Sequence, residues 1–176
     1  FDYLFRKDKV TDSGYLMQVG VKPVTSDYPR PPLVNSRFAD ICYDYLDKIV
    51  DLCRENDIEI MFMKAPSLSP IWYDEWDQQI VDYAAEKGIY YINFLNYQEE
   101  IGIDWDKDTY DSGLHLNVYG AEKLADYLGN IITERYDLAD HRNEAEIASV
   151  WDKKAADYQA RKSGMEAEYA SKNAEK

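Results

Sequence analysis

The sequence predicts an α/β fold, in which a parallel sheet is flanked by helices. Two short apolar runs, 58–64 and 89–94, have the composition of strands buried on both faces. The amphipathic segment 71–87 between them has a length suited to the crossover connection of two parallel strands. Further amphipathic segments lie before and after this pair. Alternation of strands and helices is typical of the α/β class.

The chain divides into three predicted segments. Residues 1–34 are turn-rich and predict loops with at most a short hairpin, which the prolines at 29, 31 and 32 end. Residues 35–142 form the α/β domain. Residues 143–176 are rich in Ala, Glu and Lys and predict a long terminal helix, docked over its first turns and then solvated.

The first predicted helix begins near Asn35 or Ser36 and packs on the sheet. Its apolar positions recur at helical spacing and comprise Phe38, Ile41, Cys42, Tyr45, Ile49, Leu52 and Cys53. The two cysteines lie about three turns apart on that face, too far for a disulfide, so we expect buried thiols. The spacing of the chain's potential metal ligands predicts no metal site, and the sequence indicates no cofactor.

The first strand ends in a loop that carries Ser67 and Ser69. Ligands bind beyond the carboxyl ends of strands in open α/β sheets, so Ser67 is a candidate substrate contact. A turn or helix-capping role is the favoured alternative for a serine between prolines. Neither serine lies in a strand-to-helix elbow, and neither is predicted to be a nucleophile.

The helix over 71–87 places Trp72, Trp76, Ile80, Tyr83 and Ala84 inward, and Gly88 ends it. Core packing of the two tryptophans is favoured over a sugar site. The loop that follows the second strand is rich in aspartate, including Asp104, Asp106 and Asp108. The spacing of a calcium loop is incomplete there, so we expect solvated carboxylates.

The segment 111–124 carries the strongest functional signal. His115 follows Asp111 by four residues and precedes an amphipathic helix, whose first turn Asn117 is able to cap. A histidine that acts as general base needs an acceptor to fix one ring nitrogen. Asp111 and His115 are therefore the candidate catalytic pair, with Asn117 as a candidate substrate contact. The other histidine, His141, has no acceptor at this spacing and is predicted to lie on the surface.

The pattern D-x-x-x-HLN-x-x-GA-x-K over 111–123 resembles the carboxyl-terminal histidine block of the SGNH (GDSL-type) hydrolase superfamily, and most closely a bacterial branch of it. Segments 58–67, 88–94 and 136–142, followed by Trp151, support this resemblance. It implies a three-layer, flavodoxin-like sheet and a Ser-His-Asp apparatus. Ser112 stands where the wider superfamily has its aspartate, and Asp111 lies one residue further back.

The resemblance also implies a function. Such proteins are esterases or acyltransferases of cell-envelope carbohydrate, located outside the cytoplasmic membrane and in some cases anchored to it. The Gly-Asp-Ser block of the family has no match here, and the chain begins at Phe1. We therefore expect the carboxyl-terminal part of a longer polypeptide, whose amino-terminal fragment or a partner chain supplies the nucleophile and completes the sheet.

Two alternatives remain open. A non-catalytic module could use the Tyr- and Trp-rich strand edge to hold glycan, and an acidic adaptor could bind a protein through its terminal helix. The formal net charge of −14 opposes binding to phosphate backbones, so nucleic acid is not an expected partner.

Overall fold

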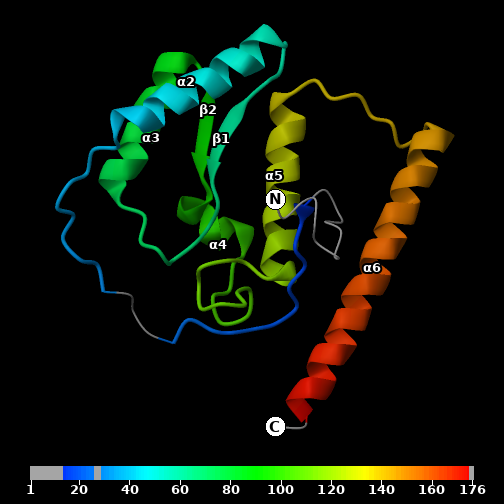
Figure 1. Cartoon of the computed structure of the whole chain (residues 1–176). Helices are drawn as coiled ribbons and strands as arrows, with labels where there is room; N and C mark the ends of the chain where they lie inside the picture. Colours follow the sequence, from blue (N-terminus) through cyan, green and yellow to red (C-terminus); the bar gives the residue numbers. More distant parts are fainter. Residues whose placement is uncertain (1–13, 26–28, 175–176) are drawn as a thin grey trace, which may run out of the picture.

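The computed structural model of the chain describes residues 14–25 and 29–174. Their elements, in chain order, are α2 (Asp40–Glu55), β1 (Met61–Lys64), α3 (Asp74–Lys87), β2 (Tyr90–Asn93), a 3₁₀ turn (Phe94–Tyr97), α4 (Gln98–Ile101), α5 (Val118–Arg135) and α6 (Ala145–Ala174) (Figure 1). This mixture of helices with a small parallel sheet confirms the α/β class at a coarse level. Of the loop-rich segment predicted over 1–34, the structure describes 14–25 and 29–34, which form no strand; the other residues of that segment fall outside the described ones.

The sheet consists, within the described residues, of β1 paired in parallel with β2. The register runs from Met61 opposite Tyr90 to Lys64 opposite Asn93, which confirms the predicted strand–helix–strand unit. Both strands are shorter than predicted. The backbone N–H of Ile58 donates to the Cys53 carbonyl, so the chain is still closing the turn after α2 at the position where the strand was expected to begin.

Alternation of side chains along the strands assigns one helix to each face of the sheet. On one face, Phe62 stacks on Tyr83 of α3 with ring centroids 6.1 Å apart. On the other, Ile92 and the fully buried Phe94 form a cluster with residues of α4 and α5, including Leu128. Helices α3 and α5 therefore cover opposite faces, and the carboxyl ends of the strands point towards the start of α5 (Figure 1).

Helix α2 begins at Asp40, later than predicted, because the preceding residues are held extended. The side-chain amide of Gln79 in α3 accepts from the Phe38 backbone N–H at 3.0 Å and donates to the Ser36 carbonyl at 2.7 Å. Ala39, at the N-cap position, offers no side-chain acceptor. The helix starts only where these contacts release the backbone.

The apolar face of α2 is exposed, so the prediction that it packs on the sheet is wrong. The helix instead contacts α3 through another face: the Tyr43 ring lies 5.8 Å from the Tyr83 ring, the Tyr43 hydroxyl donates to Gln79, and the Tyr83 hydroxyl donates to Asp47. Its exposed apolar side chains are Ile41, Tyr45, Ile49 and Leu52, each between 49% and 59% accessible. Cys42 is also exposed and Cys53 partly so, which corrects the expectation of buried thiols.

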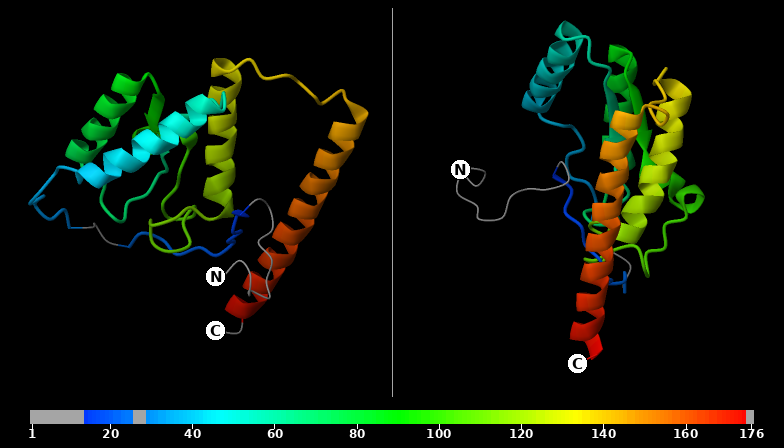
Figure 2. Two further views of the ribbon diagram at one scale, coloured as in Figure 1. Left: turned by 45° about the horizontal axis from the view of Figure 1, so that its top comes forward. Right: turned by 90° about the vertical axis from the view of Figure 1, so that its right-hand side faces the viewer.

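Helix α6 lies on the far side of α5 from the sheet (Figures 1 and 2). Its later turns dock, because Met165 packs on a cluster of Met17, Val19 and Val118. Its first turns are exposed, with Trp151 63% accessible. The predicted order of docked and solvated turns is thus reversed. Among the described residues, no helix combines the length and low polarity needed to cross a bilayer.

Candidate functional site

Two loops meet at the carboxyl ends of the strands. The backbone N–H groups of Leu68 and Ser69, which follow β1, donate to the Gly113 carbonyl at 2.7 and 3.3 Å. Gly113 has φ +92°, and a Cβ there would lie 3.0 Å from Val24 and 3.2 Å from Leu68. Only glycine fits this conformation and this spacing. The loop after β1 and the loop that carries His115 are therefore joined by backbone contacts.

His115 and Asp111 form the pair that their spacing predicted. The imidazole Nδ1 lies 2.6 Å from Oδ2 of Asp111, and the His115 backbone N–H donates to Oδ1 at 2.8 Å. An ionised carboxylate can only accept, so Nδ1 carries the hydrogen and Nε2 is left as the basic nitrogen. Tyr110 stacks on the imidazole with centroids 5.7 Å apart and planes 9° apart. The ring is thus fixed from its edge and from its face.

The charge on Asp111 is stabilised by His115. Partial burial by itself raises the pKa of this carboxyl, but hydrogen bonds from the His115 side chain and backbone outweigh it, and the net pKa is lowered. The carboxylate therefore remains ionised at neutral pH. An ionised neighbour stabilises the imidazolium that forms when His115 accepts a proton.

Asn117 supports this loop from within the protein. Its side-chain oxygen accepts from the Tyr119 and Gly120 N–H groups and so caps α5, as predicted. Its amide donates to the carbonyls of Gly20 and Lys107 at 3.1 and 2.6 Å. Because Asn117 is only 1% exposed, its placement does not support the predicted substrate contact. We assign it a positioning role.

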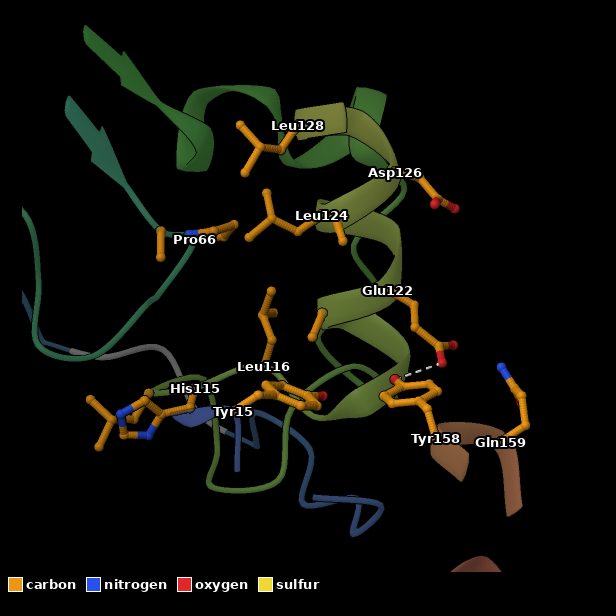
Figure 3. Close-up of a pocket in the computed structure, with 14 residues that line it drawn as sticks. Tyr15, Pro66, His115, Leu116, Glu122, Leu124, Asp126, Leu128, Tyr158 and Gln159 are labelled. Carbon is orange, nitrogen blue, oxygen red and sulfur yellow. Dashed lines mark hydrogen bonds between the residues drawn. The ribbon is translucent and has the colours of Figure 1, made fainter. Parts of the chain in front are cut away.

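A cleft of about 880 Å³ lies beside His115. It is bounded by Ala65 and Pro66 after β1, by the His115 loop, by α5 and by Tyr158 of α6. Figure 3 shows Leu124 and Leu128 pointing from α5 towards Pro66, and the Tyr158 hydroxyl bonded to Glu122. The cleft is therefore mainly apolar, with the imidazole at one end.

The loop after β1 also places a lysine next to Ser67. The Lys64 ammonium donates to the Ser67 hydroxyl at 2.8 Å and to the Ala65 carbonyl at 2.6 Å. It lies 5.7 Å from the centre of the Trp72 ring. Lys64 was not among the predicted site residues, although a lysine at the carboxyl end of an apolar strand indicates a polar group at the edge where ligands bind. The hydroxyl of Ser67 is an acceptor within this loop.

The aspartate-rich loop is not uniformly solvated. Asp108 is 2% exposed, and its carboxylate accepts from Lys123 at 2.6 Å and from the Asp104 backbone N–H at 2.8 Å. The expectation of a solvated carboxylate is therefore wrong for Asp108, because the loop folds back on α5. In the part of the chain that the structure describes, no group of His, Cys, Asp and Glu side chains is arranged to hold a metal ion.

His141 lies on the surface as predicted, but it does have an acceptor. Its Nδ1 is 2.6 Å from the Glu144 carboxylate, three residues further along the chain. The imidazole and the carboxylate are both about half exposed, and neither lines the cleft beside His115. This pair resembles Asp111–His115 in distance and provides a matched control for it.

Comparison with known proteins gives no relative: no family profile, no curated protein and no solved structure matches the chain. The interpretation of the site therefore depends on its own geometry.

Proposed function

We propose that the chain supplies the histidine–aspartate half of an SGNH-type serine esterase or O-acyltransferase. The observation that carries this proposal is the double contact of His115 with Asp111, which selects the tautomer and leaves Nε2 available. A general base and the group that orients it need this geometry. The apolar cleft that begins at the imidazole offers space for an acyl group.

In the proposed reaction, a serine from outside the visible sequence attacks the carbonyl of an acyl ester. His115 Nε2 takes the hydroxyl proton as the C–O bond forms, and gives it to the alcohol that leaves. Water or a sugar hydroxyl then removes the acyl group from the serine, with His115 again as base. Asp111 keeps its charge and stabilises the imidazolium in both steps.

The surfaces around β1 support a further strand as the source of the nucleophile. Within the described residues, β1 pairs with β2 only, so one backbone edge of β1 carries no strand. On the face towards α5, Met63 of β1 is 45% exposed whereas Ile92 of β2 is 6% exposed. The open side of the sheet is therefore the β1 side, where the cleft lies. A parallel strand added there would be covered on one face by α5.

The exposed apolar face of α2 also supports an additional segment on the β1 side of the sheet. Ile49 and Leu52 are about half exposed, although they belong to a regular amphipathic helix. An amino-terminal fragment or partner chain that extends the sheet to three layers would cover this face and bury the β1 edge. Its serine would end the added strand, at the edge where His115 lies.

The substrate that we propose is an ester-linked acyl group on carbohydrate of the cell envelope, and the location that we propose is extracytoplasmic. Both follow from the family resemblance of the block over 111–123. The formal net charge of −14 opposes binding to anionic lipid and to nucleic acid.

A second candidate function is a glycan-binding module without catalysis. The aromatic cluster at the start of α3 favours it: Trp76 lies 5.7 Å from Trp72, 4.8 Å from Tyr73 and 6.3 Å from Phe38 between ring centroids. Aromatic rings of this kind bind sugar faces. These rings contact one another, however, whereas the histidine pair borders an open cleft, so the enzyme is the preferred proposal.

The test is fluorophosphonate labelling of the purified sample, read by intact mass together with amino-terminal sequencing of every polypeptide present. We expect an adduct on a serine of a companion or upstream segment, and loss of labelling and of acetyl-ester hydrolysis by about 100-fold or more in His115→Ala. His141→Ala, the matched control, should label as the wild type. An assembled protein with intact His115 that takes no label would contradict the enzyme and favour the binding module.

A further inference from the structure

The ammonium group of Lys64 lies at the same carboxyl end of the sheet as the His115 site. Lys64 is the last residue of β1, on the side of the sheet that faces α3. Its ammonium donates to one hydroxyl and one carbonyl, and among the described residues no carboxylate lies within ion-pair distance of it. Burial lowers its pKa, and the charge of Asp77 opposes this shift only in part. Within residues 14–25 and 29–174, the ammonium therefore lacks a close counter-ion.

The position of Lys64 is set by its neighbours. Trp72 provides an aromatic wall for the ammonium, and its own indole N–H donates to Asp77 at 2.9 Å. Asp77 also accepts from the Tyr91 hydroxyl at 2.6 Å and from the Asn93 amide at 2.9 Å. One oxygen of this carboxylate, Oδ1, therefore accepts from all three neutral donors, and no ion pair joins Asp77 to Lys64. The Lys64 ammonium therefore lies near the Asp77 carboxylate but forms no direct ion pair with it.

Lys64 and Ser67 are connected to the histidine site. Leu68, next to Ser67, donates its N–H to Gly113, two residues before His115. Ala65 and Pro66, between Lys64 and Ser67, line the cleft that ends at the imidazole. Lys64 and Ser67 do not line this cleft themselves, so a substrate with its ester at His115 would reach them by extending past Ala65 and Pro66.

We infer that Lys64 and Ser67 form a subsite for an anionic group of the substrate, next to the ester that His115 acts on. The third ammonium hydrogen and the Ser67 hydroxyl hydrogen are the donors that such a group would accept. A charge-assisted hydrogen bond from an ammonium is shorter and stronger than one between neutral groups. The inference rests on the proposed function, and it narrows the substrate to an acylated polymer that carries carboxylate or phosphate.

The selectivity of this subsite follows from its surroundings. The chain has a formal net charge of −14, so its overall field repels anions. An anion that binds must therefore do so by direct contact with Lys64. A neutral sugar cannot provide the counter-charge and would leave the half-buried ammonium as it is.

The test is titration of the ¹⁵N-labelled protein, purified with any polypeptide that accompanies it, with glucuronate, glycerol phosphate and glucose. We expect saturable shifts of the Ser67, Leu68 and Gly113 amide signals with at least one of the two anions and none with glucose. Glucuronate alone would identify a sugar acid as the source of the charge, and glycerol phosphate alone a phosphate polymer.

Variants separate the subsite from the rest of the loop. Lys64→Met should weaken anion binding about tenfold or more, Lys64→Arg should retain most of it, and Lys48→Met on α2 should leave it unchanged. If Lys64→Met does not fold, Ser67→Ala still tests the subsite, because the bond to Ala65 and the Trp72 contact remain; it should weaken binding severalfold.

Two results would overturn the inference. Equal shifts with glucose would show that the charge is not recognised, and unchanged anion affinity in both Lys64→Met and Ser67→Ala, or in Ser67→Ala alone where the former is unfolded, would show that these residues only hold the loop. His115→Ala should bind the anion as the wild type does. Failure of the subsite is thus distinguishable from failure of the proposed catalysis, which His115→Ala tests by labelling.

Discussion

Gly120 in the first turn of α5 lies against Asp108 so closely that a Cβ at position 120 would be 2.7 Å from the Asp108 carbonyl oxygen. This contact sets how near the aspartate-rich loop comes to the helix. It also places the buried Asp108 carboxylate within reach of Lys123, one turn further along.

Gly120→Ala should therefore destabilise the protein by about 1–3 kcal/mol, because a backbone carbonyl cannot move away as a flexible side chain can. Gly129→Ala in the same helix is the control. A Cβ there meets nothing within 4 Å, so it should stabilise the protein by about 0.5–1 kcal/mol. Urea unfolding of the two variants measures both effects, and equal effects would contradict the role of the Asp108 contact.

Lys123→Met should cost about 2 kcal/mol or more in the free energy of unfolding. The substitution leaves the Asp108 side chain, 3% exposed, without its cation in a buried place. Lys107→Met removes the partner of Asp104 in the same loop, but Lys107 is 77% exposed, and this change should stay below about 1 kcal/mol. A comparable loss in the two variants would mean that burial of Asp108 does not matter.

The Asp111 carboxyl should titrate below its unperturbed value of 3.8. Because the pKa of Asp111 is lower in the folded state, its carboxylate contributes fully to the free energy of unfolding above about pH 4. This contribution is lost as the pH falls through the pKa of the folded state. Direct ¹³C NMR titration of the carboxyl carbon measures it. In His115→Ala the pKa should rise, since partial burial remains while the ring hydrogen bond is gone. His141→Ala should leave the pKa of Asp111 unchanged. An Asp111 pKa that is the same in His115→Ala as in the wild type would contradict the interaction between the two residues.

The docking of α6 should depend on its later turns. Met165→Ala removes a side chain from the cluster of Met17, Val19 and Val118, and we expect amide exchange throughout α6 to accelerate about tenfold or more. Trp151→Ala is the matched control in the same helix, where 63% exposure predicts an effect within about 0.5 kcal/mol. Faster amide exchange in Trp151→Ala than in Met165→Ala would show that the first turns of α6 dock, and not the later ones.

Local patterns in the sequence were sufficient for the strand–helix–strand unit, for α5 and α6, and for the pair of His115 and Asp111. They did not predict the 3₁₀ turn, α4, or where β1 and α2 begin. The periodicity of α3 and α5, the left-handed Gly88 and the cap at Asn117 are all decided within a few residues. So is the four-residue spacing of Asp111 and His115, since both lie in one loop. The shared edge of Ser67 and His115 followed from the parallel pairing of the two strands.

The orientation of α2 was beyond such reasoning. Its amphipathic pattern is genuine, but the helix is turned by hydrogen bonds from Tyr43 to Gln79 and from Tyr83 to Asp47, each joining residues 36 apart in sequence. The pattern of α2 alone cannot reveal these partners. The burial of Asp108 and the partners of Lys64 were missed for a similar reason, because each depends on how a loop folds back.

The bond between Tyr169 and Val21 joins residues 148 positions apart, since the Tyr169 hydroxyl accepts from the Val21 N–H and donates to its carbonyl. Contacts between residues so far apart in sequence form late in folding, because the entropy cost of closing a long loop comes before the contact can stabilise the chain. During synthesis, the segment around Met17 and Val19 leaves the ribosome long before Met165 exists. The cluster of Met17, Val19 and Val118 at the start of α5 therefore stays partly uncovered during synthesis until α6 has been made and has left the ribosome.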